Sequence, residues 1–575
     1  MKRFLALLMA LVMIMGLAAC GAGGEDPKPA EDDTSGSGET DASGETDASG
    51  ETDASGETDA SEDLNETKYL KLVWDAKNDT LSGFLTPMQS GNCQSHVLMW
   101  STLVKYNIED DSYYSDLAES WEISEDGKMY TFHLRQDAKW HDGEPVTAAD
   151  VVYTVNFVVK NAGYSANKLV AIKGYQDVAD GVAETLAGVT APDDYTVVLE
   201  LDSPNFDLLY VFSALHMAIV PEHLLGTKDW ADAAVDEEFW ANPVGSGPYK
   251  VNETAYPNYV TLVRNDDYYG GTAKIKNIQL TSYADQTAIN AALMAGDLAW
   301  YKVQSTEEAD TITSSNKEME AIAMNSEYCR GLFMNLSDSD TARDDLKDPR
   351  VRQALNMIID KQMIVDYMGI IASVATTYNY QKYNTDIPVW ERDVDTAVKM
   401  LEEAGYDFDD PLRLYTNYAD QQSHDIMEMI VSSLKEAGVA AEYYVDSSNA
   451  YSIIYETLDF DMLYGACLGI DCGAFAQVNP GALYDVWYND EILAELSERY
   501  GKLIVEYSAT NDAAKREQLL DQLQFNSMED MHRIPIWFMR TVWIVNTAQV
   551  EGYEPISSSF EWYCDGNCLN WSFIQ

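Results

Sequence analysis

Several sequence patterns that mark enzymes and nucleic-acid-binding proteins are missing from this chain of 575 residues. It has no Gly-x-Ser-x-Gly elbow of a serine hydrolase and no Gly-Lys-Ser loop that cradles phosphates. Basic residues are scarce, with 37 Lys and Arg against 96 Asp and Glu and a formal net charge of −59. Because phosphate binding needs basic patches, nucleic acid and polyanionic solutes are poor candidate partners.

The negative charge is spread over the whole chain. The first residues contribute +2 and residues 21–66 contribute −15, which leaves −46 for the remainder. Most of this charge is expected on a solvated surface. It mildly favours cationic or zwitterionic ligands through long-range steering.

The N-terminus predicts export and lipidation. Lys2 and Arg3 precede an apolar run from Phe4 to Leu17 that is too short to span a bilayer comfortably. The run ends in Leu-Ala-Ala-Cys-Gly, which resembles a bacterial lipobox with Cys20 as the lipidated residue. We expect a signal peptide over residues 1–19 and an extracytoplasmic protein whose only membrane attachment is the lipid on Cys20. An ordinary secretory signal with a chance cysteine is the alternative.

Residues 20–66 predict a disordered tether. Gly-Glu-Thr-Asp-Ala-Ser occurs four times between Gly38 and Ser61, without a large apolar residue. Such a segment has nothing to bury, and its like charges favour extension. A calcium-binding repeat is the weaker alternative, because the repeats lack the glycine-rich loop geometry that would order the acids.

The roughly 510 residues that follow are too many for one hydrophobic core, so two or more lobes are expected. Short strands and helices alternate along them, which favours an α/β fold with mixed sheets. The predicted strands are Tyr69–Trp74, Thr196–Leu201, Val260–Arg264, Gln279–Ser282, Ile534–Phe538 and Val542–Asn546. The predicted helices are Asp285–Ala295, Pro349–Tyr367, Thr396–Ala404, Ser423–Ala437 and a long helical stretch from Asp490 to Met531.

The segment Leu117–Tyr153 predicts a hairpin that leads into a helix. Met129–Arg135 alternates polar and apolar residues, as a half-buried strand does, and Gly127 precedes it in a turn. Thr147 stands three residues before Asp150, the spacing of a capping box at a helix start.

Five sequence blocks, in the same order and spacing, resemble the solute-binding proteins of peptide-type ABC transporters, the extracytoplasmic family 5. Tyr269 stands where that family usually has Trp, and the likeness extends from about residue 70 to residue 545. The blocks are Leu117–Tyr153, Asn242–Lys250 (NPVGSGPYK), Arg264–Gly271 (RNDDYYGG), Ala295–Ala299 (AGDLA) and Asp348–Asn356 with Ile359–Lys361 (DPRVRQALN, IDK).

The resemblance implies a two-lobed fold like that of periplasmic binding proteins, of type II with an extra subdomain. Residues 67–323 and 534–575 would form lobe I, residues 324–533 would form lobe II, and the ligand would bind in a cleft between them. The implied function is that of a monomeric, non-enzymatic receptor that delivers a solute, foremost an oligopeptide, to an ABC permease. An oligosaccharide, a nickel chelate and a sensory role are the alternatives.

The resemblance also implies a ligand-binding loop. Family members that bind peptides present an aspartate after a lobe II strand, where it receives the α-ammonium group, and Asp471 stands at that position. Gly469 would let the ligand backbone approach closely. The family's usual Tyr-Pro-Asp-Pro-like continuation is replaced here by Cys-Gly-Ala-Phe, which leaves the ligand class open. The alternative role for Asp471 is a local structural ion pair.

Apart from Cys20, six cysteines remain, and six cysteines allow 15 pairings. Some oligopeptide-binding relatives join a cysteine matching Cys329 to one in the aspartate loop, so the resemblance favours Cys329 with Cys467 or Cys472. Cys564 and Cys568 could close a tight loop. None of the six has the spacing of a zinc site, and we expect neither a metal nor a cofactor.

Further ligand contacts are expected from three places. Arg330 could meet a ligand carboxylate or form a structural ion pair. Asn92 and Gln94 follow the first strand and could offer hydrogen bonds to solute, with helix capping as the alternative. Trp300 and Tyr301 occupy a position that often faces the cleft in the family, with core packing as the alternative. The stretch from His141 to Glu144, by contrast, lacks the helical histidine pair of a zinc protease, and the family uses it as a scaffold turn.

Overall fold

The computed structural model describes residues 63–74, 94–107, 112–163, 165–255, 257–303, 305–375, 390–468, 486–554 and 567–574. The predicted signal peptide, Cys20 and the tether up to residue 62 lie outside these ranges. Within them, every helix is too short or too polar to traverse a bilayer.

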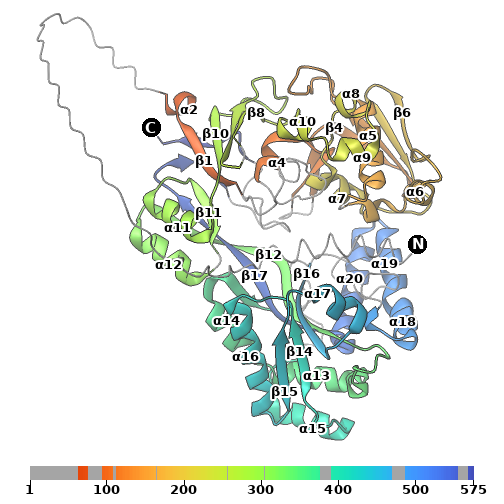
Figure 1. Cartoon of the computed structure of the whole chain (residues 1–575). Helices are drawn as coiled ribbons and strands as arrows, with labels where there is room; N and C mark the ends of the chain where they lie inside the picture. Colours follow the sequence, from red (N-terminus) through yellow and green to blue (C-terminus); the bar gives the residue numbers. More distant parts are fainter. Residues whose placement is uncertain are drawn as a thin grey trace, which may run out of the picture.

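The upper lobe in Figure 1 is built on two four-stranded sheets. One has the order β1-β10-β9-β8, with strands Tyr69–Trp74, Asn277–Ser282, Tyr259–Arg264 and Tyr249–Ala255. The other has the order β4-β5-β7-β6, with strands Ala118–Ile123, Met129–Leu134, Thr196–Glu200 and Val189–Asp193. Two small pairs complete it: β2 (Val104–Asn107) with β3 (Ser112–Ser115), and β18 (Val550–Glu551) with β19 (Ser572–Phe573).

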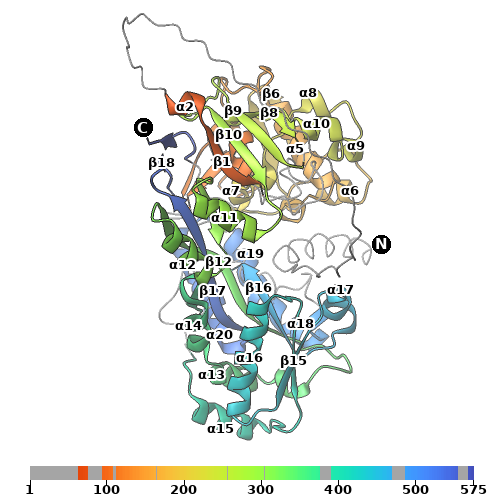
Figure 2. The same ribbon diagram turned by 60° about the vertical axis from the view of Figure 1, so that its left-hand side comes forward.

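The lower lobe surrounds a seven-stranded sheet. Its order is β11-β17-β12-β16-β14-β15, with β13 paired to β17. The strands are Trp300–Val303, Arg533–Asn546, Met319–Met334, Met462–Leu468, Leu412–Thr416, Ala441–Val445 and, for β13, Ala372–Val374. The long strands β12 and β17 pass from one lobe to the other in Figures 1 and 2, so they connect the lobes as a hinge would.

Helices cover both lobes. In the upper lobe they are α2 (Leu64–Thr67), α4 (Gln94–Met99), α5 (Ala148–Lys160), α6 (Tyr175–Ala179), α7 (Leu208–Ser213), α8 (Glu222–Leu225), α9 (Trp230–Ala234) and α10 (Glu237–Ala241). At the junction and in the lower lobe they are α11 (Gln286–Ala295), α12 (Thr306–Ser315), α13 (Pro349–Ile358), α14 (Lys361–Met368), α15 (Val394–Ala404), α16 (Gln421–Glu436), α17 (Ala450–Ser452), α18 (Asp490–Leu496), α19 (Lys502–Ser508) and α20 (Ala513–Asp530).

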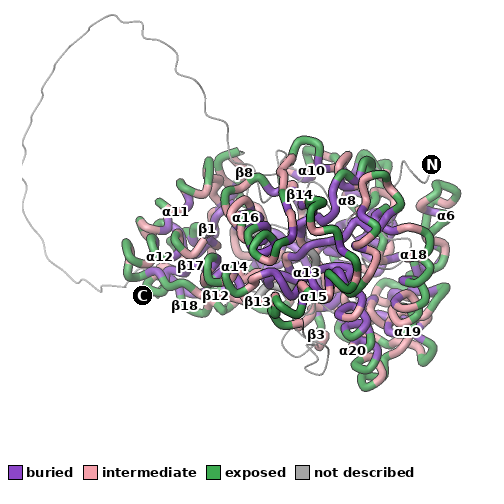
Figure 3. The backbone as a smooth tube through the Cα atoms, turned by 90° about the horizontal axis from the view of Figure 1, so that it is seen from below, coloured by how far each residue is buried: buried purple, intermediate pink, exposed green. Residues whose placement is uncertain are grey.

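Two hydrophobic cores meet at the strands that join the lobes. Because successive strand residues point to opposite faces, β11 sends Trp300 into the upper core and Tyr301 into the lower core. In the same way, β17 places Trp543 in the upper core and Ile544 in the lower core. Figure 3 shows the buried residues in the interior and exposed residues on peripheral helices such as α6 and α19. The lobe boundaries remain predictions; α11 and α12, assigned above to lobe I, pack into the lower core.

Most predicted elements are present, with three differences. The helix expected over Pro349–Tyr367 is broken at Ile359, because Asp360 caps a second helix by accepting a hydrogen bond from the Met363 N–H at 3.0 Å. The stretch Asp490–Met531 is interrupted before α20, whose N-terminus Asp512 caps. The two strands expected between Ile534 and Asn546 form the single strand β17.

Local signals in the sequence are confirmed where they depend on short-range hydrogen bonds. The Thr147 N–H donates to Asp150 Oδ2 at 2.7 Å, which makes the predicted capping box at the start of α5. Asp348 accepts from the Arg350 N–H at 2.9 Å at the start of α13. Gly127 has a φ of +65°, as the predicted turn requires.

Candidate functional site

The carboxyl ends of three parallel strands meet at one edge of the lower sheet. β14 pairs in parallel with both β15 and β16. β16 runs antiparallel to β12, with Met462 opposite Met334 and Leu468 opposite Tyr328. Because β12 begins at Met319 beside the upper core and runs down into the lower lobe, β16, β14 and β15 all end toward the upper lobe. In open α/β sheets, ligands bind outside this carboxyl edge.

Arg330 and Tyr418 form the centre of this edge. Arg330 lies on β12 opposite Ala466 of β16, and its guanidinium carbon is 4.2 Å from the centre of the Tyr418 ring. Tyr418 follows β14, and its N–H donates to Thr416 Oγ1 at 3.2 Å. Thr416 Oγ1 in turn donates to the Tyr464 carbonyl at 3.1 Å. The stacked ring orients the guanidinium of the half-buried Arg330 without neutralising its charge.

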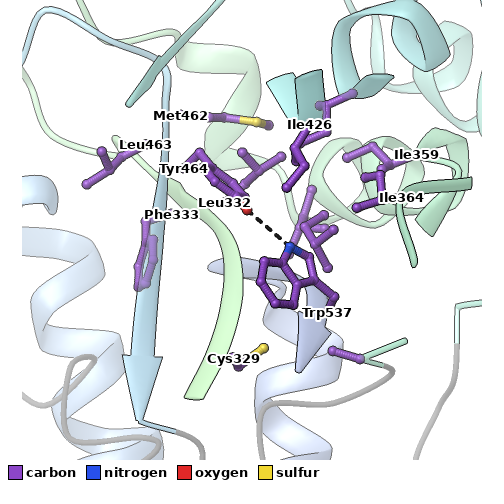
Figure 4. Packing of buried hydrophobic residues seen from close by; sticks show 14 of the residues in the cluster. Cys329, Leu332, Phe333, Ile359, Ile364, Ile426, Met462, Leu463, Tyr464 and Trp537 are labelled. Atoms are coloured by element: carbon purple, nitrogen blue, oxygen red, sulfur yellow. Dashed lines mark hydrogen bonds between the residues drawn. The ribbon is translucent and has the colours of Figure 1, made fainter. Parts of the chain in front are cut away.

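Tyr464 and Trp537 support this pair from beneath. The Trp537 Nε1–H donates to Tyr464 Oη at 3.1 Å, the dashed contact in Figure 4. Burial raises the pKa of Tyr464, and the Arg330 charge opposes the rise. The Tyr418 and Tyr464 rings meet edge to face, with centroids 6.2 Å apart. These aromatic side chains give the guanidinium a rigid platform.

Cys329 lies on the adjoining position of the same strand. It is fully buried, and β12–β16 pairing places it directly opposite Cys467. Cys467 is one of the two partners predicted for Cys329, the other being Cys472, and the strand register brings the Cys467 backbone alongside Cys329. Lys361 is nearby, and desolvation lowers its pKa to about 7 while the Cys329 sulfur opposes that shift. The pairing stays a prediction.

Two carboxylates mark the same edge. Asp420 caps α16, with Oδ1 accepting from the Ser423 N–H and Oδ2 from the Ser423 hydroxyl, both at 2.8 Å. Asp446 follows β15, and hydrogen bonds from Asn449 and Ser448 lower its pKa to about 2. Asp446 therefore stays ionised near neutral pH, and the oxygens of both acids hold neighbouring loops.

Trp300 and Tyr301, expected near the ligand, are 0% and 5% exposed. The Trp300 ring packs against Tyr553 and Trp571, with centroids 4.5 and 4.8 Å away. Its burial favours the core-packing alternative.

Most of the predicted loop contacts fall outside the described residues. Asp471, Gly469 and Cys472 belong to residues 469–485, and Asn92 and Cys564 also lie outside the described ranges. Only the backbones of Gln94, the first residue of α4, and Cys467, near the end of β16, are described. Cys568 is 4% exposed in the upper core. These assignments remain predictions.

The motif-rich block of the upper lobe has a different role. His141 Nδ1 accepts from the Gly245 N–H and Nε2 lies 3.1 Å from the Gly247 carbonyl, so one neutral imidazole joins two of the recognised blocks. Burial lowers the pKa of His141 to about 4, which keeps the ring neutral. A Cβ on Gly245 would lie 2.0 Å from the Met99 carbonyl oxygen, so only glycine allows this loop to pack against α4. His141 thus serves the scaffold.

A surface hollow of about 470 Å³ lies elsewhere, on the β4–β7 sheet. Its lining includes Lys128, Met129 and Glu200 of the upper lobe, whereas Arg330 belongs to β12 of the lower sheet. Sequence reasoning missed the residues that do surround Arg330, namely Tyr418, Tyr464 and Trp537. The strand that Tyr418 follows, β14 (Leu412–Thr416), was not among the predicted strands, so no signal in the sequence pointed to this tyrosine.

A family model described as "Bacterial extracellular solute-binding proteins, family 5 Middle" matches residues 112–476. Among relatives, the oligopeptide-binding protein AppA of Bacillus subtilis is 28% identical over 405 residues, which cover 65% of this chain and 70% of AppA. A Brucella ovis relative, whose name places it among ABC transporter peptide-binding proteins, is 28% identical over 63% of this chain. The match spans 66% of that relative's own length, just under two thirds.

Solved structures share the fold. The ABC transporter substrate-binding protein CtaP of Listeria monocytogenes matches with a TM-score of 0.72 at 21% identity, covering 88% of this chain and 98% of CtaP. NikZ of Campylobacter jejuni, solved in complex with Ni(L-His), matches with a TM-score of 0.68 at 20% identity, covering 88% of this chain and 99% of NikZ. At these identities the likeness establishes the two-lobed binding-protein architecture.

Proposed function

The chain belongs to family 5 of the bacterial extracellular solute-binding proteins, and from that membership we propose that it captures oligopeptides between its lobes and delivers them to an ABC permease. The arrangement of residues at the carboxyl edge of the lower sheet is the observation that favours a peptide as the solute. There a half-buried Arg330 is stacked on Tyr418, and the segment with Asp471 begins just after β16.

A peptide is a zwitterion, and the proposal gives each of its termini a partner. Arg330 would receive the carboxylate through charge-assisted hydrogen bonds, and Asp471 would receive the α-ammonium group. Hydrogen bonds to the peptide backbone would add affinity without demanding a particular side chain. The strongly acidic chain disfavours polyanions, and the oligopeptide-binding name of AppA supports the same choice. The role is binding rather than catalysis.

The test is a binding panel with di- to hexapeptides, a xylo- or cello-oligosaccharide and nickel–histidine. A solute that binds only the native state raises the melting temperature, and titration calorimetry then gives its Kd. We expect peptides to raise the melting temperature. A response to the oligosaccharide or the nickel chelate, with none to peptides, would overturn the peptide assignment.

Asp471→Asn sharpens the test, because it removes the charge and keeps the size of the side chain. Its Kd for peptide should rise at least about tenfold, the cost of losing a charge-assisted hydrogen bond in a desolvated site. Asp395→Asn, an exposed position in the first turn of α15, is the matched control and should bind normally. Equal affinities in the two variants would refute the ammonium contact.

The anchor is tested separately with Cys20→Ser in the bacterial host. The wild-type chain should fractionate with membranes and partition into detergent, because its lipid buries an acyl surface. The variant should be released as a water-soluble protein. A variant that stays in the membrane fraction would show that Cys20 is not the anchor.

A further inference from the structure

A second contact joins the lobes, remote from the strands β12 and β17. The loop before α7 in the upper lobe reaches the corner between α19 and α20 in the lower lobe. The Phe206 N–H donates to the Ser508 carbonyl at 2.7 Å. The Asp207 carboxylate accepts from Ser508 Oγ through Oδ2 and from Arg516 Nη2 through Oδ1, each at 2.6 Å.

This contact lies across the junction from the hinge. In Figure 1, β12 and β17 are at the centre and left of the junction, while α19 is at the right, below α6 and α7. The view from below agrees, with α19 and β17 toward opposite ends of the molecule (Figure 3). A rotation of the lobes about β12 and β17 would therefore separate Asp207 from Arg516 before it disturbed either core.

The lower lobe holds its half of the contact in place. Arg516 Nη1 donates to the Tyr507 carbonyl at 3.1 Å and to the Thr510 carbonyl at 3.3 Å. Its guanidinium carbon lies 3.8 Å from the centre of the Tyr507 ring. The side chain thus keeps its position when the lobes part, so little conformational entropy is lost when they meet again.

The upper lobe holds the other half in the same manner. The Asp207 N–H donates to Asn205 Oδ1 at 2.9 Å, and Tyr130 Oη donates to the Asn205 carbonyl at 2.5 Å. The Phe206 ring lies against the turn at Gly127, where an added Cβ would come within 2.6 Å of it. The acceptor is therefore also preorganised.

We propose that Asp207, Ser508 and Arg516 form a reversible latch that closes the lobes in the absence of solute and sets the population of the closed receptor. The side chains of Asp207 and Arg516 are 28% and 21% exposed, so water and salt reach the ion pair. A partly exposed ion pair shifts the equilibrium between the open and closed lobes by a small free energy. A receptor that must release its solute requires that the lobes can still open. The latch acts on closure alone and does not depend on which solute is bound.

Amide hydrogen exchange of the full chain without solute tests the latch, because the Phe206 amide is protected only while the lobes touch. In Asp207→Ala and in Arg516→Ala this amide should exchange about fivefold faster, the effect of losing one partly exposed ion pair. The double variant should exchange no faster than either single variant. Raising the salt concentration should accelerate exchange in the wild type and leave the double variant unchanged.

Two controls separate a latch from ordinary loss of stability. The Leu201 amide, bonded to the Lys128 carbonyl within the upper lobe at 2.8 Å, should keep its wild-type rate in every variant. Lys515→Ala removes the neighbouring Lys515–Glu506 ion pair of 2.9 Å, which stays within the lower lobe, and should leave Phe206 unaffected. Asp207→Asn, which removes the ion pair and keeps the hydrogen bond from Ser508, should exchange at the same rate as Arg516→Ala.

Three results would overturn the latch: an unchanged Phe206 rate in the Asp207 and Arg516 variants, equal acceleration at Leu201, or additive effects in the double variant. None of these outcomes bears on peptide binding. Conversely, a failure to bind peptides would leave the latch standing.

Discussion

The motif-rich interior of the upper lobe and the carboxyl edge of the lower sheet use polar side chains in opposite ways. In the interior, Asp150 and His141 are hydrogen-bonded to backbone groups of their own lobe. At the edge, Arg330 lies half-buried with its guanidinium on the Tyr418 ring. The residues that make the family recognisable are therefore those that hold loops together. Those that select the solute are expected where the recognisable pattern ends.

The largest expected effect is a loss of stability on substitution of a buried residue in the upper lobe. Asp150 is 3% exposed, and it accepts from the N–H groups of Thr147 and Glu222 at 2.7 and 2.8 Å. Asp150→Ala leaves these donors without their partner and should lower the free energy of unfolding by about 3 kcal/mol. Urea denaturation measures it. Asp142→Ala, in the exposed turn that precedes α5, is the control. An equal loss of unfolding free energy in both variants would contradict the structural role assigned to Asp150.

The next effect is a pH dependence. The pKa of His141 falls from 6.5 to about 4 in the folded protein, so the unfolded chain binds the proton more readily. This contribution to stability is complete above pH 6.5 and is lost as the pH falls toward 4. Between pH 7 and pH 4 the wild type should lose about 3 kcal/mol more unfolding free energy than His141→Gln, which does not titrate. If the unfolding free energies of the wild type and His141→Gln changed with pH in the same way, His141 would not be held neutral in the folded protein.

A substitution at the carboxyl edge of the lower sheet should change peptide affinity rather than the free energy of unfolding. Arg330→Gln should weaken peptide binding about tenfold, because a desolvated carboxylate would lose its cation. Its unfolding free energy should change by less than about 1 kcal/mol, the value of a cation–π contact. Arg350→Gln, an exposed arginine paired with Asp348 at 2.6 Å, should change neither quantity. A large loss of stability with unchanged affinity would make Arg330 a scaffold residue like Asp150.

The smallest effect concerns the departure from the family at Tyr269. Its hydroxyl donates to the buried Asp116 carboxylate and lies 2.9 Å from Ser101 Oγ. Tyr269→Phe should cost about 1 kcal/mol of unfolding free energy and leave peptide affinity unchanged. Tyr195→Phe, a half-buried tyrosine in the β6–β7 turn, serves as the control and should be neutral. Equal stability of the two variants would mean that the hydroxyl contributes nothing here.

Much of the fold could be predicted because its signals are local. Strands such as Tyr69–Trp74 and caps such as Thr147 and Asp348 depend on residues a few positions apart. The helix breaks at Asp360 and Asp512 were missed. At Asp360 the apolar pattern continues on both sides of the capping residue. The site was less predictable. Arg330 was named from a resemblance, and its partner Tyr418 is 88 positions away in the loop after β14.

The sequence by itself determined the family, the alternation of strands and helices, and the scaffold role of the His141 turn. These features depend on hydrophobic periodicity, helix capping and the order of motifs, which involve residues close together in the chain. The tertiary structure alone decided which distant residues meet. Pairing of β11 with β17 turns Trp300 inward, and the β12–β16 register places Cys329 opposite Cys467. Asp207 and Arg516, 309 positions apart, meet where one lobe contacts the other. Such contacts depend on strand register and lobe orientation, and a shift of one residue would send each side chain to the other face.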